Sequence, residues 1–378
     1  MILTQEQRMI KEMANSFAKD KISTNAQAWE QNGAYPEDII NEMGGLGLLG
    51  MTVPEQWGGA ETDYVSYALA LMEIAGGDGG LSTLMSVNNS PVCSVVLSAG
   101  NDQQKEQYLK PLARGEMIGS FCLTEPQAGS DASMLKTKAE KRGNGYVING
   151  SKQFITSARI AKVSIIFAIT DPEAGKKGMS AFLVPTDTKG FNVDKPEHKM
   201  GQKASDTCAI NFDDMEVSGD CLLGTEGEGY KIALANLETG RIGIGAQSVG
   251  MARAALNIAI QYANERISFG KAIIDHQAVG FRLAEMATKL AAAEALVLKA
   301  ANLKDQGQPC LVEASMAKLF ASEAAEEICS AALQTLGGYG YLSEFGLEKI
   351  ARDVRVCQIY EGTSDIQKMV IARTLKTK

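Results

Sequence analysis

The chain has 378 residues, 45% of them hydrophobic and 22% charged, with a formal net charge of −8. This length is too great for one ordinary core and predicts two or three domains, while the acidic balance with scattered lysines argues against nucleic acid as the main partner. No apolar run is long enough to cross a membrane, and the N-terminus lacks the basic and apolar regions of a signal peptide. We therefore expect a cytoplasmic protein, or a matrix protein from which a leader has been removed.

Residues 1–118 show helical periodicity, as in DYVSYALALMEIA, where apolar residues recur three and four apart. Thr4 and Gln7 have the spacing of a capping box at the start of the first helix. Glycine and proline clusters such as VPEQWGGAETD separate the helical stretches. The pattern predicts an N-terminal α-helical domain of packed helices joined by loops.

Residues 119–228 change to short β-branched and aromatic runs between turn residues. In GNGYVINGSKQFIT, Asn149 and Gly150 match the two-residue turn favoured in β-hairpins. The stretches VSIIFAITD, GMSAFLVPTD and CAINFDDMEV supply further strands. This region predicts a compact antiparallel β-domain, either a small barrel or a sandwich.

From residue 229 to 378 the pattern is helical again, with longer helices. The stretch FRLAEMATKLAAAEALVLKAANLKD carries an apolar stripe whose alanines allow neighbouring helices to approach closely. A second long helix is predicted over roughly residues 312–336, ending at Gly337 and Gly338. Helices of this kind suit a bundle, and such bundles often associate. The fold class is therefore α+β.

Cysteine and histidine usage offers little metal or disulfide chemistry. The seven cysteines are scattered and include no CxxC pair, so we interpret them as small apolar residues in a reducing compartment. His198 and His276 are the only histidines, and neither has a second nitrogen or sulfur ligand at metal spacing. The sequence predicts no metal site and no histidine-based triad.

The stretch VCQIYEGTSDIQ, residues 356–367, places the acidic Glu361 at a predicted helix break. Ser364 and Gln367 have capping-box spacing, so a terminal helix is expected to begin just after Glu361. From these residues alone, a loop acid that caps or pairs with its neighbours is the more frequent explanation. A functional carboxylate is the alternative.

Three other stretches leave a structural and a functional interpretation open. LTEPQAGSD, residues 123–131, is either an ordinary turn or a ligand-contacting loop. LETGRIGIGAQSVGMA has glycines at 240, 243 and 245 in a predicted helix, each costing about 1 kcal/mol relative to alanine, so a helix or a ligand must approach closely. ANERISFGKAIIDHQ places an arginine and a phenylalanine at a helix break, where they either cap the helix or hold a phosphate and a ring.

Taken together, the order and spacing of seven motifs resemble the acyl-CoA dehydrogenase family over essentially the whole chain. The motifs are VPEQWGG, FCLTEPQAGSD, NGSKQFIT, LETGRIGI, ERISFGK, LQTLGGYGY and IYEGTSDIQ. MSVNNS at 85–90 and glycine at position 240 look most like the short-chain (butyryl-CoA) and short/branched-chain members. The resemblance implies an N-terminal α-helical domain (1–118), a middle β-domain (119–228) and a C-terminal four-helix-bundle domain (229–378). It also implies bound FAD and a homotetramer built as a dimer of dimers.

The resemblance assigns site residues by their matching positions. Those expected to line the flavin ring are Phe121, Leu123, Thr124, Ser130, Phe154, Ile155 and Thr156, with Thr156 donating to the hydride-accepting nitrogen. Those expected to hold the adenine half of FAD from the neighbouring subunit are Arg266, Phe269, Gln277, Gln334 and Gly338, and further FAD positions are Thr363 and Asp365. Acyl-CoA positions are Ser130, Glu238, Arg241, Tyr360 and Gly362. Cofactor binding and oligomerisation should therefore be linked.

Glu361 matches the family's catalytic base. The resemblance implies that its carboxylate removes the α-proton of an acyl-CoA while the β-hydrogen leaves as hydride to the flavin, giving a trans-2-enoyl-CoA. A backbone donor beside the base and a flavin ribityl hydroxyl would stabilise the developing charge on the thioester oxygen. Burial in an apolar acyl cavity should raise the pKa of Glu361 to about 6 to 7. Electrons would pass to an electron-transfer flavoprotein.

Three positions depart from patterns within the family. Phe154 stands where many members have tryptophan, which changes ring packing and access for the electron acceptor. Gly240 cannot act as the base that some members place there, and Ser82 lacks the cation with which glutaryl-specific members bind a distal carboxylate. Short straight, 2-methyl-branched and aryl-substituted thioesters all remain open. The alternatives are an acyl-CoA oxidase, or a flavin-containing acyl-CoA lyase or binding protein on the same fold.

Overall fold

The computed structural model describes residues 1–376. Its N-terminal part is helical, with short 3-10 and π-helical turns between the α-helices. These are α1 (Gln5–Phe17), α2 (Ala26–Asn32), α3 (Glu37–Gly45), α4 (Tyr64–Gly77), α5 (Gly79–Val87), α6 (Ser94–Ala99), α7 (Asp102–Gln104) and α8 (Lys110–Ala113). The predicted capping box of α1 is confirmed, because the Gln7 backbone N–H donates to Thr4 Oγ1 at 3.1 Å and the Thr4 N–H donates to Gln7 Oε1 at 3.0 Å.

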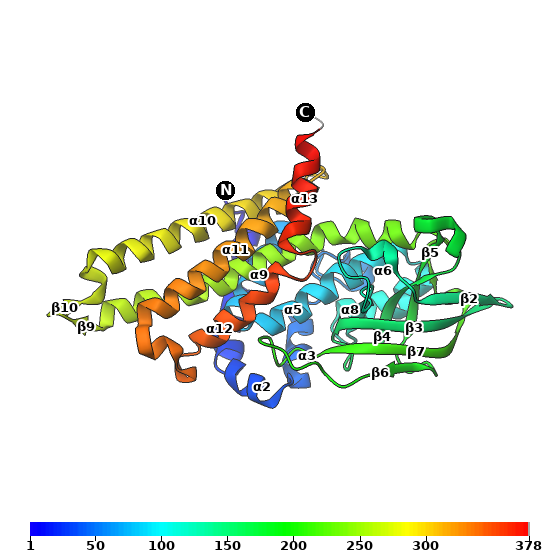
Figure 1. Cartoon of the computed structure of the whole chain (residues 1–378), viewed down its shortest axis with the longest axis horizontal. Helices are drawn as coiled ribbons and strands as arrows, with labels where there is room; N and C mark the ends of the chain where they lie inside the picture. Colours follow the sequence, from blue (N-terminus) through cyan, green and yellow to red (C-terminus); the bar gives the residue numbers. More distant parts are fainter. Residues whose placement is uncertain (377–378) are drawn as a thin grey trace.

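An eight-stranded sheet follows, at one end of the molecule (Figure 1). Its strands are β1 (Gly119–Cys122), β2 (Lys138–Arg142), β3 (Gly145–Thr156), β4 (Val163–Ile169), β5 (Met179–Pro185), β6 (Phe191–Val193), β7 (Thr207–Ser218) and β8 (Leu222–Leu223). The order is β6-β7-β3-β2-β4-β5-β8, and β1 pairs with β4. The sheet is antiparallel as predicted except at β1 and β2, which pair with β4 in parallel. Local turn signals specify only hairpin neighbours, so they could not indicate these distant pairings.

The predicted hairpin turn at Asn149 and Gly150 is wrong. Strand β3 continues through both residues, and its register against β7 shifts between Ile148 and Gly150, which marks a bulge. Gly150 has φ +146°, and a Cβ there would lie 2.5 Å from Thr137 Oγ1. The segment just before β2 therefore approaches so closely that this position requires glycine. The turn between β2 and β3 lies at residues 143–144 instead.

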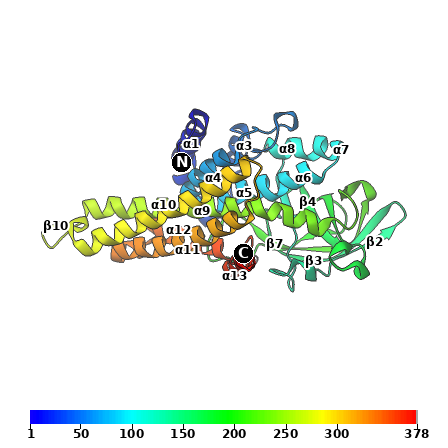
Figure 2. The same cartoon turned by 90° about the horizontal axis from the view of Figure 1, so that it is seen from above.

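The remaining chain forms a bundle of long helices that extends away from the sheet (Figures 1 and 2). Its elements are α9 (Gly229–Glu265), β9 (Ile267–Ser268), β10 (Lys271–Ala272), α10 (Gln277–Asp305), α11 (Leu311–Leu336), α12 (Leu347–Val354) and α13 (Ser364–Leu375). Helix α9 packs against α10 and α11 and also against α4, so one apolar core joins the bundle to the N-terminal helices. Among residues 1–376, no helix combines the length and the apolar character needed to cross a membrane.

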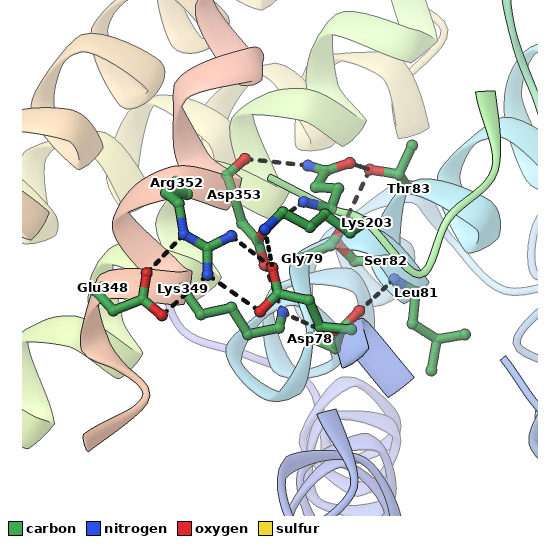
Figure 3. A network of polar contacts seen from close by, with 12 residues as sticks. Asp78, Gly79, Leu81, Ser82, Thr83, Lys203, Glu348, Lys349, Arg352 and Asp353 are labelled. Carbon is green, nitrogen blue, oxygen red and sulfur yellow. Dashed lines mark hydrogen bonds and ion pairs between the residues drawn. The ribbon is translucent and has the colours of Figure 1, made fainter. Parts of the chain in front are cut away.

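A buried ionic cluster ties these regions together (Figure 3). Lys349 on α12 donates to Asp78 Oδ2 at 2.7 Å and to Asp353 Oδ2 at 2.6 Å. Asp78 also caps α5 through the Leu81 N–H at 2.7 Å, and Asp353 accepts from the Gln202 backbone N–H in the loop between β6 and β7. Burial, together with repulsion from Asp78, raises the pKa of Asp353 to about 6 although Lys349 opposes the shift. Both buried carboxylates, Asp78 and Asp353, therefore depend on Lys349 for their ion pairs.

We expect Lys349→Met to destabilise the protein by about 3–5 kcal/mol, because it leaves two buried carboxylates without a counter-charge. Lys368→Met is the matched control, since this exposed lysine pairs with Glu323 at 3.2 Å, an interaction worth about 0–1 kcal/mol at most. Urea unfolding followed by circular dichroism measures both. Equal midpoints for the two variants would contradict a structural role for the cluster.

Candidate active site

Glu361 lies in the connection between the 3-10 helix Arg355–Gln358 and α13. Its φ of +54° is unusual for a residue with a side chain, and Gly362 follows with φ +89°. Such a conformation costs free energy and persists only where the surrounding structure enforces it. The turn therefore fixes where the Glu361 carboxylate points.

Two buried side chains hold this turn. Lys318 Nζ on α11 donates to the Gly362 carbonyl oxygen at 2.7 Å, and Gln367 Nε2 donates to the same oxygen at 2.9 Å. Gln367 Nε2 also lies 3.2 Å from the Glu361 carbonyl oxygen. Both Lys318 and Gln367 are fully buried. The strained backbone at Glu361 is thus stabilised by donors from two different helices.

The predicted capping box of Ser364 and Gln367 is wrong by one residue. Helix α13 begins at Ser364, and its N-cap is Thr363, whose Oγ1 accepts from the Ile366 N–H at 3.4 Å. Gln367 reaches back to the carbonyls of Glu361 and Gly362 and not to an N-cap N–H. The positive φ of Glu361 and Gly362 sets this geometry, and capping-box spacing alone does not report it.

The carboxylate itself is only partly compensated. Glu361 as a whole is half-buried, but its Oε2 atom is fully buried and has no hydrogen-bond partner among the described residues. Burial raises the pKa of Glu361 to about 7, while the positive charges of Lys318 and Arg241 act to lower it. This value agrees with the range expected from the sequence. An unpartnered carboxylate with such a pKa can take or release a proton near neutral pH.

Helix α9 passes directly over this carboxylate. A Cβ at Gly240 would lie 2.5 Å from Glu361 Oε2, so only glycine leaves the carboxylate in place without a shift. The other two glycines face neighbouring helices, since a Cβ at Gly243 would lie 2.7 Å from Ser86 Oγ and one at Gly245 would lie 2.9 Å from Val297 Cγ2. The close approach predicted for this helix therefore comes from Glu361 at one position and from helix packing at the others.

The acyl-CoA positions on α9 differ in how they are satisfied. Glu238 Oε1 accepts from Lys304 Nζ and from Cys310 Sγ, each at 3.2 Å. Arg241 is buried and donates through Nη1 to Ser315 Oγ at 3.2 Å, but its Nε has no partner in the described part of the chain. Arg241 is thus a buried cation with spare donor capacity, as a residue that orients an anionic group would be.

The residues expected around the flavin ring lie together at the ends of β1 and β3. The Thr124 carbonyl accepts from the Gln153 N–H at 2.9 Å and joins the two segments. Phe154 has φ +60° and is 64% exposed, so its ring is presented outside the sheet. The others range from buried to exposed: Leu123 and Ile155 are buried, Phe121 and Thr156 half-buried, and Ser130 exposed.

Sequence reasoning missed the buried ion pair that supports this loop. Lys152 Nζ donates to Glu125 Oε1 at 2.8 Å and to the Phe167 carbonyl at 2.7 Å, and both Lys152 and Glu125 are buried. Glu125 also accepts from the Thr137 N–H at 3.0 Å. The only sequence signals were two charged residues inside otherwise apolar strand and loop motifs.

The second expected cofactor set lies elsewhere, at the far end of the bundle (Figure 1). Arg266 and Gly338 line a cavity of about 390 Å³, and Phe269 in the β9–β10 turn is 95% exposed with φ +52°. Gln277 begins α10, and Gln334 lies in the last turns of α11. From Gly240 to the end of α9 the helix rises about 1.5 Å per residue, so roughly 40 Å separates Gly240, which lies beside Glu361, from Arg266 in one chain.

These surroundings fit a bound flavin nucleotide. An open cavity lies beside Arg266 and Gly338, and the aromatic rings of Phe154 and Phe269 are exposed. An extended cofactor with a ring at each end would cover surfaces of this kind. In residues 1–376, no three His, Cys, Asp or Glu side chains gather as metal ligands would.

Comparison with known proteins gives matches over the whole chain. Three family models match in order: the acyl-CoA dehydrogenase N-terminal domain at residues 4–116, the middle domain at 120–215 and the C-terminal domain at 227–376. An acyl-CoA dehydrogenase from Bacillus subtilis is 46% identical over 99% of both chains. The mitochondrial short-chain specific acyl-CoA dehydrogenase of Homo sapiens is 43% identical over 98% of this chain and 90% of its own.

Other matches add solved structures and a complex. Caffeyl-CoA reductase-Etf complex subunit CarC from Acetobacterium woodii is 41% identical over 100% of both chains. Butyryl-CoA dehydrogenase from Megasphaera elsdenii superposes with a TM-score of 0.96, at 39% identity over 100% of this chain and 99% of its own. A chain from a study of the electron transferring flavoprotein of Acidaminococcus fermentans has a TM-score of 0.98, at 41% identity over 100% of both. This chain therefore belongs to the acyl-CoA dehydrogenase family of flavin-dependent oxidoreductases.

Proposed function

We propose that this protein is an FAD-dependent dehydrogenase of short-chain or short/branched-chain acyl-CoA thioesters, with Glu361 as its catalytic base. The observation that carries the proposal is the buried, unpartnered Oε2 of Glu361 on a positive-φ turn, with a pKa raised to about 7. Perturbed carboxylates of this kind are typical of catalytic sites. Family membership supplies the chemistry in which such a base is used.

The chain's residues divide the work as follows. Glu361 takes the α-proton of the thioester, and the electron pair of that C–H bond becomes part of the new C2=C3 double bond. The backbone N–H beside the base supports the negative charge that develops on the thioester oxygen. The residues expected around the flavin ring, with Arg266, Gly338 and their neighbours from a second subunit, would hold FAD, which when bound would supply the acceptor for the β-hydride. Arg241 and Glu238 contact the acyl-CoA, together with Ser130, Tyr360 and Gly362.

The proposed substrate class rests on Ser82 of α5 and on the relatives. Ser82 is fully buried, donates to the Gly79 carbonyl at 2.7 Å and accepts from Gln247 Nε2 at 2.7 Å. Its hydrogen-bonding capacity is used inside the protein, and it offers no cation for a distal carboxylate. The matches to short-chain and butyryl-CoA dehydrogenases favour a short apolar acyl group.

The partners proposed are a second copy of the chain and an electron-transfer flavoprotein. The roughly 40 Å along α9 between Gly240, beside the base, and Arg266 favours an FAD that bridges two chains, in the dimer of dimers that the family resemblance implies. The Etf-associated relative and structural neighbour favour electron-transfer flavoprotein as the redox partner. A second candidate, reduction of an enoyl-CoA by the reverse reaction, is favoured by the 41% identity to a caffeyl-CoA reductase subunit.

We expect butyryl-CoA or 2-methylbutyryl-CoA to bleach the oxidised flavin of the anaerobic holoenzyme, and we expect Glu361→Gln to bind the thioester without bleaching. The amide keeps the shape of the side chain but cannot accept the α-proton. Flavin absorbance during anaerobic titration measures both, with the more effective thioester setting the acyl class. Reoxidation by oxygen at the rate of turnover would favour the oxidase alternative, and absence of bleaching by any saturated thioester would favour the lyase or binding alternative.

The pH dependence follows from the raised pKa of Glu361. Because the base is active only when ionised, kcat/KM should fall as the pH drops below about 7, the value to which burial raises its pKa. An ordinary glutamate would remain ionised down to about pH 4.3. Initial rates with an artificial electron acceptor from pH 5 to 9 measure the limb, and a flat profile from pH 5 upward would contradict a buried base.

Gly240→Ala should separate stability from activity. Alanine in a helix interior is favoured over glycine by about 1 kcal/mol, which should raise or preserve the melting temperature. Its Cβ would meet Glu361 Oε2 at 2.5 Å and displace the carboxylate, so kcat should fall. Gly307→Ala is unsuitable as a control because Gly307 has φ +65°, where alanine would be strained. Gly338→Ala is unsuitable because Gly338 belongs to the proposed cofactor site. Gly45, the last residue of α3 with open space at its Cβ position, provides the matched Ala substitution. Full activity of Gly240→Ala would contradict the proposal that the Glu361 carboxylate acts as the base from its position beside Gly240.

A further inference from the structure

Lys318 is a charged residue in the middle of an apolar helix. It lies on α11 among the buried alanines Ala314, Ala317, Ala321 and Ala325, and its side chain is fully buried. Its Nζ donates to the Gly362 carbonyl at 2.7 Å, and it forms no ion pair with any described carboxylate. Lysines are almost never fully buried unless they are paired with an acid. The position therefore needs an explanation beyond packing.

The charged and titratable groups around Lys318 come from several elements. Arg241 faces it from α9, Cys357 from the 3-10 helix, Glu361 from the turn after that helix, and Glu323 from further along α11. Burial lowers the pKa of Lys318 to about 8, and the negative charge of Glu361 acts in the opposite direction. Burial raises the pKa of Tyr67 on α4, and the negative charge of Glu361 acts in the same direction. Burial also raises the pKa of Glu361, and among these groups Lys318 and Arg241 are the cations whose charges act to lower it.

We propose that Lys318 is a positioning residue for the base, which holds the Glu361–Gly362 turn through the Gly362 carbonyl and keeps the Glu361 carboxylate ionised by its charge. The proposal rests on the proposed function of Glu361. It assigns to Lys318 no contact with substrate or flavin.

The geometric part of this role follows from the strained turn. Glu361 and Gly362 both have positive φ, and the Gly362 carbonyl receives two donors, Lys318 Nζ and Gln367 Nε2. These donors come from α11 and α13, so the carbonyl is clamped between two helices. The Gly362 carbonyl belongs to the Gly362–Thr363 peptide, and the Glu361 carbonyl, which accepts from Gln367 Nε2 at 3.2 Å, belongs to the Glu361–Gly362 peptide. Both peptides after Glu361 are therefore held, which restrains the backbone from which the Glu361 side chain projects.

The electrostatic part follows from the missing partner. Glu361 Oε2 has no hydrogen-bond donor among the described residues, so positive charges that do not touch it, those of Lys318 and Arg241, help to stabilise its ionised form. Arg241 is assigned to the acyl-CoA under the proposed function, whereas Lys318 donates to the Gly362 carbonyl and is assigned no contact with substrate. A neutral glutamine could donate equally well to a carbonyl. The feature that the ammonium group adds at this position is therefore its charge.

The test compares neutral and charged replacements at position 318. In Lys318→Met we expect the pKa of Glu361 to rise by about 1 pH unit or more, as on removal of a nearby opposite charge. The acid limb of kcat/KM should move to higher pH by the same amount, with a loss of about fivefold at pH 7. An infrared pH-difference spectrum, with Glu361→Gln identifying the carboxyl band, measures this pKa without turnover.

Three further variants make the outcome decisive. Lys318→Gln keeps a donor for Gly362 but removes the charge, so its limb should shift as in Lys318→Met with a smaller loss at high pH. Lys318→Arg should keep the wild-type limb, and Lys368→Met, which removes an exposed lysine on the adjacent helix, should change neither readout. If the Met variant does not fold, the Gln and Arg variants decide the question, because they differ in charge.

An unshifted carboxyl band and acid limb in both neutral variants would overturn the proposal, even if their activity were lower. That result would make Lys318 a structural residue only. Failure of the wild-type flavin to bleach with any saturated thioester would instead overturn the proposed function. The infrared titration of Glu361 does not depend on that activity, so the two failures are distinguishable.

Discussion

The Oε2 atom of Glu361 is buried without a hydrogen bond from any residue that the structure describes, and much of the surrounding structure compensates for that single condition. Burying an unpaired charge is costly, so the group shifts its pKa to about 7 and remains on the border between its two protonation states. Lys318 and Arg241 supply positive charge nearby without a direct ion pair to the carboxylate that would weaken it as a base. A direct ion pair would lower the pKa further and occupy the oxygen that has to receive a proton.

The position of this carboxylate is held by contacts that reach all three regions of the fold. Tyr360, the residue before it, donates to Gln247 Oε1 on α9 at 3.1 Å, and Gln247 Nε2 donates to Thr83 on α5 at 2.9 Å. Thr83 in turn donates to Gln202 at 2.8 Å, and Gln202 is bound to Asp353 in the ionic cluster of Figure 3. The turn is therefore anchored to helices before and after the sheet, and to a loop of the sheet region itself.

The sequence predicted those features that local chemistry determines. Helical periodicity located the two helical regions, and the Thr4–Gln7 box was correct because all its partners lie within one turn. The Asn149–Gly150 turn was wrong because Thr137, remote in sequence, approaches Gly150 and demands glycine inside a strand. The parallel pairing of β1 with β4 was missed for the same reason, since it joins segments about 40 residues apart without a turn between them.

The site shows the same division. Glu361 was located through a motif that the family resemblance made interpretable, and its setting in a turn where Glu361 and Gly362 both have positive φ then gave that motif a physical basis. Lys318 and Lys152 were missed because periodicity treats a lysine in an apolar stripe as an interruption. Their roles depend on carbonyls at Gly362 and Phe167, which only the folded chain brings within 2.7 Å of each ammonium. A buried lysine with a carbonyl partner is therefore a feature to seek in structures, where sequence patterns give no signal.

The length of α9 connects this local chemistry to assembly. Its N-terminal part carries Gly240 beside the base, and its C-terminal end carries the Arg266 side of the proposed cofactor site, roughly 40 Å away at about 1.5 Å per residue. An FAD that contacts both ends joins two chains under the proposed function, because one helix cannot bring its own ends together. Cofactor binding would then stabilise the assembled form by mass action. Under the proposed function, the rigid helix that places the base also makes catalysis a property of the oligomer.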